Sequence, residues 1–220
     1  TIGGLILDGG NFDWGKAGVD RQPALNTPDP CYGGVVWDEQ VTKNMGLPFA
    51  YLLKLRTTLL RDLGGAMSPF NAWMFIQGLE TLPLRMREHA NNAQKVAEFL
   101  ASNKKVQSVT YPGLFEGAEK EKADKYMTGG YGALIGFELP GGKEAGSKFI
   151  DSLELLYHVA NIGDSRSLAI HPATTTHSQL APEEQLSAGV TPGYVRLSIG
   201  IENAEDIIAD ISQAIDKASK

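Results

Sequence analysis

The side chain best suited to hold a small charged molecule is Arg196, which lies inside the apolar segment Tyr194–Ile199. If this arginine faces inward, its charge must be paired, because burying an unpaired charge is costly. A guanidinium can hold a carboxylate through two parallel hydrogen bonds, so the partner is an acidic side chain of the chain itself or an acidic ligand. Strand arginines also often face solvent, and the spacing leaves these three cases open.

Two polar segments that could accompany Arg196 come shortly before it. Asn161–Asp164 is a turn after an apolar stretch, and Ser167–Thr176 is rich in hydroxyl groups. His171 and His177 lie within reach of one another, but no cysteine or carboxylate is near them in the sequence, so they make a poor metal site. We therefore expect no metal, and we predict that these histidines fix a polar loop through hydrogen bonds.

Three further candidates favour a structural interpretation over a chemical one. The glycine-rich segment Pro140–Lys148 lacks the spacing of a phosphate loop, so we expect a strand-to-helix turn. Lys54 lies in an apolar helical run. We expect its aliphatic stem to lie along the apolar surface and its ammonium to reach water. Cys31 has Asp29 nearby and no adjacent cation that would activate a thiolate, so we do not expect it to be a nucleophile.

The composition is that of a globular protein. The 220 residues are 42% hydrophobic and 21% charged, which suits one large domain or two small ones. With 20 basic and 26 acidic residues the net charge is −6, which argues against nucleic acid and anionic membranes as partners. The single cysteine excludes a disulfide within the chain and favours a cytoplasmic location. No apolar run approaches the ~20 residues of a membrane helix.

The elements that must position these residues are strands mixed with helices. Runs that alternate apolar and polar residues, or that are apolar throughout, predict strands at Val106–Tyr111, Ala133–Leu139 and Tyr194–Ile199. The same signal is weaker at Leu155–Ala160. Helical periodicity and capping residues predict helices at Phe49–Leu63, from Pro69 to a break at Pro83, and at Leu84–Ala101, Lys143–Leu153 and Ala204–Ala218. This mixture indicates an α+β sheet layered with helices.

The first part of the chain is less regular. Ile2–Asp8 is typical of a buried strand, and the absence of a methionine or polar lead-in before it suggests a chain cut from a longer one. Residues 11–48 contain four prolines and look irregular. We expect them to form a folded surface excursion pinned by Trp14, Tyr32 and Trp37.

Five motifs follow one another in an order that is familiar. They are Leu63–Ala72 (LGGAMSPFNA), Gly78–Met86 (GLETLPLRM), Tyr111–Leu114 (YPGL), Ser167–His177 (SLAIHPATTTH) and Val195–Glu202 (VRLSIGIE). Together they resemble the Cys/Met-metabolism family of pyridoxal-phosphate (PLP) enzymes, over essentially the whole chain.

Within that family, the long excursion at residues 11–48 resembles the O-acetylhomoserine sulfhydrylase branch. Asn161 supports this branch, because γ-lyases tend to carry serine there. The alternatives are a methionine or cystathionine γ-lyase, a cystathionine γ-synthase, and a non-catalytic binding or structural module.

The resemblance implies an α/β, fold-type I PLP transferase. Residues 1–82 would be the C-terminal remnant of the large PLP-binding domain, with a long insertion and the connecting helix, and residues 83–220 the small C-terminal α/β domain. It places the Schiff-base lysine just upstream of Thr1, so no catalytic residue is expected in this chain. The expected partner is the N-terminal part of the same enzyme, and the complete protein is expected to be a homotetramer.

The implied reaction makes homocysteine or methionine from O-acetylhomoserine and sulfide or a thiol, with PLP as cofactor. In it Arg196 would clamp the α-carboxylate of the amino acid, and Asn161 would offer its amide to the same carboxylate. Thr176 would orient the guanidinium or the carboxylate. Ser167 and His171 are expected to build the surrounding loop.

Overall fold

The computed structural model describes residues 1–219, which fall into two compact units divided between Leu79 and Glu80. Each unit has its own hydrophobic core. The assignment of residues 1–82 and 83–220 to a large and a small PLP domain stays a prediction. None of the helices in the described residues is both long and apolar enough to cross a membrane.

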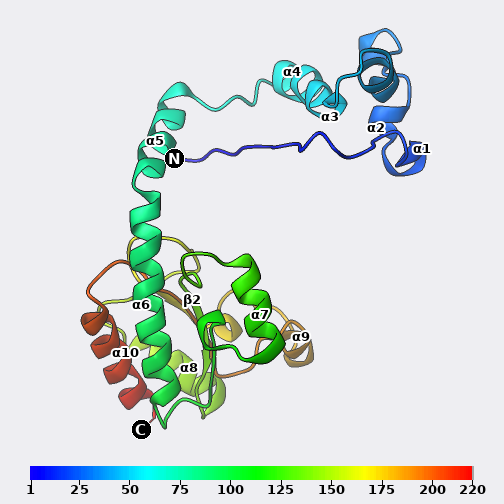
Figure 1. Ribbon diagram of the computed structural model, residues 1–220. Helices are drawn as coiled ribbons and strands as arrows, with labels where there is room; N and C mark the ends of the chain where they lie inside the picture. The colour runs from blue at the N-terminus through cyan, green and yellow to red at the C-terminus, as the bar shows by residue number, and fades with distance from the viewer. Residues whose placement is uncertain (220) are drawn as a thin grey trace. The chain divides into compact units, whose positions relative to one another are not determined.

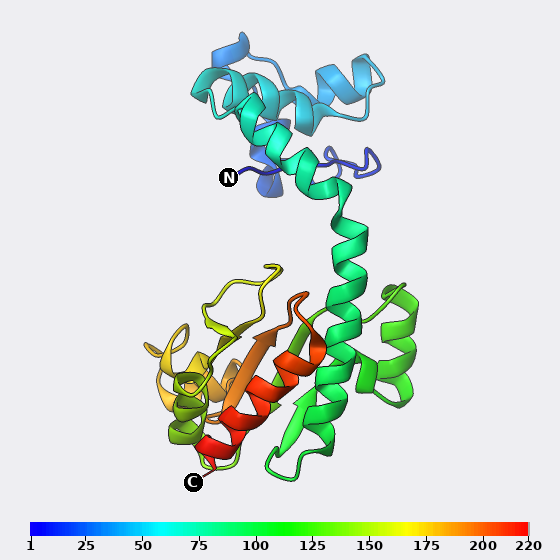
Figure 2. The ribbon, with the colours of Figure 1, turned by 90° about the vertical axis from the view of Figure 1, so that its left-hand side faces the viewer.

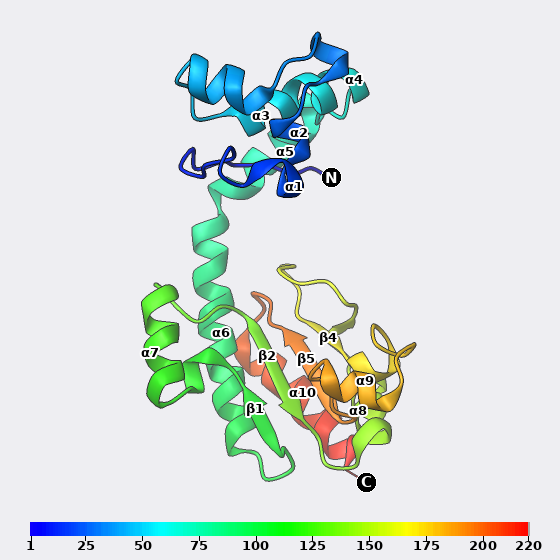
Figure 3. The same ribbon diagram turned by 90° about the vertical axis from the view of Figure 1, so that its right-hand side faces the viewer.

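The second unit is organised around a five-stranded sheet with the order β1-β2-β5-β4-β3. Its strands are β1 Ser108–Thr110, β2 Leu134–Glu138, β3 Tyr157–His158, β4 Leu168–Ile170 and β5 Tyr194–Ser198. Figure 3 shows β5 between β2 and β4, and it pairs antiparallel with both. This register places Arg196 opposite Gly136 on one side and Ile170 on the other.

Three helices cover one face of this sheet: α6 Leu82–Ser102, α8 Gly142–Asp151 and α10 Ala204–Ala218. Figure 2 shows α6 and α10 side by side against it. Val195 and Leu197 of β5 are fully buried in the core that these helices form with the sheet. Because successive strand residues point to opposite faces, Arg196 between them faces away from the helices.

The predicted elements of this unit are confirmed, with shorter strands. The predicted stripe of the long helix is fully or almost fully buried: His89, Ala93, Val96, Ala97 and Leu100. The glycine-rich segment Pro140–Lys148 is the predicted turn into a helix, which begins at Gly142.

Three elements of the second unit were not predicted from the sequence: β4, α7 Gly117–Tyr126 and α9 Pro182–Ser187. Both helices are polar, and Ala123 of α7 is their only residue classed as buried in the described part of the chain. β4 is only three residues long and buried at every position, so it offers no alternation to recognise.

The break between the two long helices lies slightly before its predicted place. Helix α5 is Pro69–Glu80, and its first turn is capped by Ser68, whose Oγ accepts a hydrogen bond from the Asn71 amide at 3.1 Å. Helix α6 begins at Leu82, with Pro83 inside its first turn. Proline is tolerated there because the first amides of a helix have no intrahelical acceptor.

The prediction of irregular backbone over residues 11–48 is wrong, because short helices occupy much of this segment. They are α1 Gly18–Arg21, α2 Pro23–Asn26, the 3₁₀-helix η1 Pro30–Tyr32 and the π-helix η2 Asp38–Asn44. Pro23 and Pro30 begin helices instead of breaking them, since proline fits a first helical position. The helix predicted at Phe49–Leu63 is present as α3 Ala50–Lys54, the π-helix η3 Leu55–Leu60 and α4 Arg61–Leu63.

Aromatic residues pin this excursion as predicted. Trp37 is buried with Leu25, Val41 and Ala50, and the Tyr32 ring lies edge-on to it at 5.2 Å. The Trp14 ring stacks on Tyr51 with ring centroids 5.0 Å apart. These contacts give the first unit its small core.

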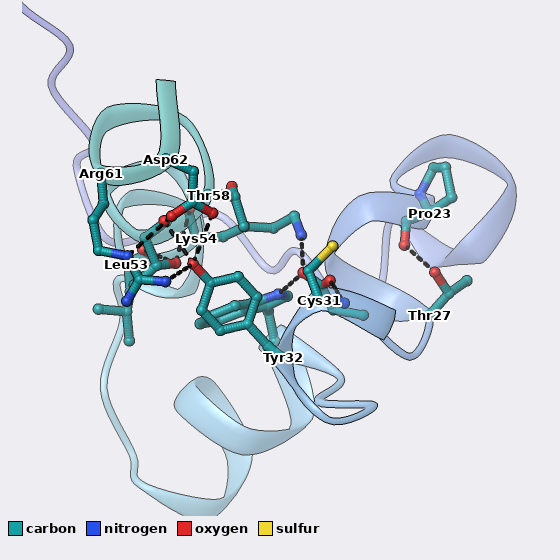
Figure 4. A network of polar contacts seen from close by, with 12 residues as sticks. Pro23, Thr27, Cys31, Tyr32, Leu53, Lys54, Thr58, Arg61 and Asp62 are labelled. Carbon is teal, nitrogen blue, oxygen red and sulfur yellow. Dashed lines mark hydrogen bonds and ion pairs between the residues drawn. The ribbon is translucent and has the colours of Figure 1, made fainter. Parts of the chain in front are cut away.

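Lys54 does not reach for water, so that prediction is wrong. Its Nζ lies 2.6 Å from Oδ2 of Asp29, in the polar network of Figure 4, and its side chain is only 19% exposed. The Trp37 indole N–H donates to the same carboxylate oxygen at 2.8 Å. The Lys54 ammonium, and then this indole donor, lower the pKa of Asp29. Only the folded excursion brings Asp29 opposite a lysine so distant in sequence.

The predicted strand Ile2–Asp8 is not formed. Figure 1 shows this segment as an extended chain without a pairing strand, and Ile2, Leu5 and Leu7 are 91%, 78% and 86% exposed. A strand requires a hydrogen-bonded neighbour, and no described segment of this chain provides one.

Cys31 is exposed, and its backbone amide donates to Oδ1 of Asp29 at 3.0 Å. The nearby Lys54 ammonium pairs with the same aspartate. We expect Cys31→Ser in the complete protein to change kcat by less than about threefold, because a nucleophilic thiol needs a cation or base that activates it. Steady-state kinetics beside circular dichroism checks this, and a folded but inactive variant would contradict it.

Candidate functional site

Arg196 is held at the sheet surface by the loop that follows β3. Its Nη2 donates to the carbonyl oxygen of Ala160 at 2.6 Å and lies 3.4 Å from that of Asn161. Its Nε is buried and has no hydrogen-bond acceptor among residues 1–219. None of the ion pairs among the described residues includes Arg196. Of the three cases that the sequence left open, an acidic partner within the described chain is therefore excluded.

The loop at residues 160–163 runs along β5 and is tied to it at two points. The first is the bond between Ala160 and Arg196, and the second is the Gly163 amide, which donates to Oγ of Ser198 at 3.2 Å. The structure thus brings the backbone carbonyl of Asn161 beside the guanidinium, and the role of its side-chain amide stays a prediction. Asn161 is exposed, so its amide is accessible to a bound molecule.

Thr176 lies on a different loop, after the 3₁₀-helix η5 Pro172–Thr174. It is exposed, and its hydroxyl lies 2.9 Å from Nδ1 of its neighbour His177. Within the described residues no hydrogen bond joins Thr176 to Arg196 or Asn161. Its role in orienting either group stays a prediction.

Ser167 and His171 build the loops around the site, as predicted. The Ser167 hydroxyl donates to Glu202 at 2.9 Å and accepts from the Gly200 amide at 2.8 Å. His171 is completely buried, with Nδ1 2.9 Å from the Thr174 hydroxyl and Nε2 2.8 Å from the Pro192 carbonyl. Burial lowers the pKa of His171, although the bond to Pro192 opposes the shift. A neutral imidazole braced at both nitrogens is a structural part of the loop.

Tyr194 shares the face of β5 with Arg196 and was not recognised from the sequence. Its ring lies across Gly136 on β2, where a Cβ would collide with the tyrosine ring and hydroxyl. A glycine at position 136 is therefore required for this placement. Burial raises the pKa of Tyr194, and the positive charge of Arg196 opposes that shift.

An apolar cavity of about 410 Å³ adjoins the loop at residues 160–163. Its lining comes from separate parts of the second unit, and its apolar side chains include Met86, Met127, Leu134 and Ile162. The polar residues at its wall are already engaged. Nδ1 of His89 lies 2.7 Å from the Ile199 carbonyl, Ser198 accepts from Gly163, and the Tyr131 hydroxyl donates to Asp124 at 2.6 Å. No local pattern in the sequence predicts this cavity, because five distant segments form it.

A guanidinium with an unpaired N–H on the open face of a layered α/β unit is suited to a small anionic molecule. Residues 1–216 match the family model described as Cys/Met metabolism PLP-dependent enzyme. The chain belongs to this family.

Similar proteins agree with this assignment. The chain is 52% identical over 219 residues to an O-acetyl-L-homoserine sulfhydrylase of Leptospira meyeri, covering 98% of this chain and 49% of that protein. It is 45% identical over 218 residues to a homocysteine synthase of Schizosaccharomyces pombe, covering 99% of this chain and 49% of that protein. The chain thus spans about half the length of the curated relatives it matches.

A solved structure from Campylobacter jejuni, named as an O-acetylhomoserine (thiol)-lyase, has a similar fold. The TM-score is 0.77 at 44% identity, over 90% of this chain and 45% of that one. That protein carries N'-pyridoxyl-lysine-5'-monophosphate. The family similarity therefore confirms the expected fold class and cofactor.

The described residues fit one part of a PLP site. No lysine lines the cavity or hydrogen-bonds to Arg196 in the described part of the chain, so nothing at this site resembles a lysine that carries the cofactor. The guanidinium has a donor without an acceptor, and this suits a carboxylate. These residues therefore suit a small ligand that carries a carboxylate.

Proposed function

We propose that this chain is the C-terminal part of a PLP-dependent O-acetylhomoserine sulfhydrylase. The complete enzyme would make homocysteine or methionine from O-acetylhomoserine and sulfide or a thiol, with release of acetate. The observation that carries this proposal is Arg196, a guanidinium fixed by the Ala160 carbonyl and without a carboxylate partner among the described residues. The names of the similar proteins supply the substrate class.

PLP, when bound, supplies the electron sink for the reaction. The residues of this chain supply orientation. Arg196 clamps the α-carboxylate, and the rigid fork of its guanidinium fixes the amino acid in one plane. Asn161 adds an amide donor to the same carboxylate, and Thr176 orients one of these groups. The loop tied between Ala160 and Gly163 holds the first two in register.

The complete protein would contain an N-terminal part that carries the Schiff-base lysine. Helix α5 supports this, because none of its residues is buried, and Phe70, Trp73, Ile76 and Leu79 are 54–64% exposed. A helix that is apolar on all sides is normally covered. We also propose that the complete enzyme is a cytoplasmic homotetramer, with residues 1–82 in its large domain and 83–220 in its small domain.

The test is an assay of the complete protein with each candidate substrate. With O-acetylhomoserine and sulfide we expect homocysteine and acetate in equal amounts, whereas this chain alone should be inactive. Methionine, cystathionine or cysteine without a second substrate should release little ammonia. Rapid ammonia release from methionine or cystathionine would identify a γ-lyase instead and would overturn the proposal.

A further inference from the structure

We propose that the apolar cavity beside Arg196 is the subsite for the alkyl group of a thiol substrate. Its specificity-determining residues are Met86, Met127, Leu134 and Ile162. This inference rests on the proposed function and adds to it the class of sulfur donor: thiols with an alkyl chain of several carbons.

The position of the cavity follows from the sheet. Arg196 and Ser198 are two residues apart on β5, so they point to the same face about 7 Å apart. Leu134 lies directly opposite Ser198 on β2, and Gly136 lies opposite Arg196. The carboxylate clamp and the Leu134 and Ser198 part of the cavity wall are therefore neighbours on one face, while Met86 and His89 reach the cavity from α6.

The loop at residues 160–163 joins the two features. Ala160 contacts Arg196, while Ile162 and Gly163 form part of the cavity wall. The γ-carbon of a homoserine ester is three covalent bonds from its carboxylate carbon. With that carboxylate at Arg196, the cavity lies within reach of a group that reacts at the γ-carbon.

The lining selects for an apolar group. The thioethers of Met86 and Met127 and the branched chains of Leu134 and Ile162 offer no charge or strong hydrogen bond. Ser198, His89 and Tyr131, the polar residues at the wall, already have partners. Sulfide gains nothing from such a surface, whereas an alkyl chain gains from leaving water. The volume of about 410 Å³ falls in the ordinary range for small-molecule sites and has room for more than a methyl group.

The reaction balances with a thiol as the second substrate. The sulfur forms a bond to the γ-carbon of O-acetylhomoserine, and the bond between that carbon and the ester oxygen breaks. Acetate leaves with the electron pair, and the thiol proton passes to solvent. The product is an S-alkyl homocysteine, whose alkyl group would occupy the cavity.

The test uses the complete enzyme with sulfide and a series of thiols from methanethiol to butanethiol. For the unmodified protein, each added methylene should raise kcat/KM by about three- to fivefold until the cavity is full. In Leu134→Trp the indole occupies the cavity, so the ratio of kcat/KM for propanethiol to that for sulfide should fall at least about tenfold. Leu186→Trp on α9 is the matched control, because Leu186 is 56% exposed and is not among the cavity residues, and its ratio should not change.

A binding measurement gives a readout that does not depend on turnover. Saturation-transfer NMR with dipropyl sulfide, which has no thiol proton, should show contact with the unmodified protein and the Leu186→Trp control. The signal should be lost in Leu134→Trp. If that variant does not fold, Ile162→Trp narrows the same cavity from an exposed loop and should give the same result.

This inference would be overturned, while the proposed function stands, if kcat/KM did not rise from methanethiol to butanethiol. An unchanged NMR signal in a folded Leu134→Trp or Ile162→Trp protein would overturn it as well. Failure to form homocysteine from O-acetylhomoserine and sulfide would overturn the proposed function. The dipropyl sulfide measurement would then still decide whether the cavity binds alkyl groups.

Discussion

Arg196→Ala in the complete enzyme is expected to lower kcat/KM for O-acetylhomoserine by about 30- to several-thousand-fold. Removing one member of a hydrogen-bonded charge pair typically costs ~2–5 kcal/mol, which corresponds to that range. The loss arises because the substrate carboxylate would have no guanidinium to fix its orientation. The protein should remain yellow, since the cofactor is expected to be held mainly by residues outside this chain. Steady-state kinetics with circular dichroism and an absorbance spectrum measure all three properties.

Two further variants test the geometry of the clamp. Arg196→Lys should recover only part of the activity, because an ammonium cannot reproduce two parallel hydrogen bonds. Asn161→Ala should cause a smaller loss in the same direction. If Arg196→Ala shows unmodified kinetics, Arg196 does not hold the substrate and is a structural residue that anchors the Ala160 carbonyl.

Among the substitutions proposed for this protein, Asp210→Ala should lower the free energy of unfolding the most. Asp210 is 6% exposed on α10, and its carboxylate accepts hydrogen bonds from the backbone amides of Glu154, Leu155 and Leu156 at 2.9, 2.8 and 3.0 Å. Gln213 donates to it as well, at 2.9 Å. These bonds fix the segment that leads into β3 and the loop of the site. Alanine leaves the three amides without an acceptor, so we expect the free energy of unfolding to fall by about 3 kcal/mol.

The effect of Asp210 should depend on pH. Burial by itself raises the pKa of this carboxyl, but the three amides and Gln213 together outweigh burial and lower the pKa below its ordinary value of 3.8. A carboxyl with a lowered pKa in the folded state contributes stability that is complete well above the unfolded value. That contribution is lost as the pH falls through the folded pKa. The difference between Asp210→Ala and the unmodified protein should therefore be full at neutral pH and shrink below about pH 4.

Urea unfolding followed by circular dichroism at several pH values measures this difference. Asp210→Asn is the control, because it keeps one acceptor oxygen, and its loss should be smaller. A difference between Asp210→Ala and the unmodified protein that stays constant from neutral pH to below pH 4 would contradict the assignment.

The sequence by itself determined the local structure and the family. The stripe of α6, the amphipathic face of α10 and the Ser68 cap of α5 each depend on residues within a few positions of one another. Strands β2 and β5 were predicted because their pattern also lies within a few neighbouring residues. The ordered motifs led to the family, its cofactor and the residues Arg196, Asn161 and Thr176.

Only the tertiary structure decided how distant segments meet. Arg196 could have faced an acidic side chain, and the sheet register together with the loop at residues 160–163 shows that its partner is a backbone carbonyl. Lys54 was expected to reach water, and the folded excursion pairs its ammonium with Asp29. The cavity beside Leu134 joins five separate segments, and no periodicity within any one of them predicts it. Periodicity records which face of an element is apolar, whereas partners across a sheet or a loop depend on strand order and register, which act over the whole chain.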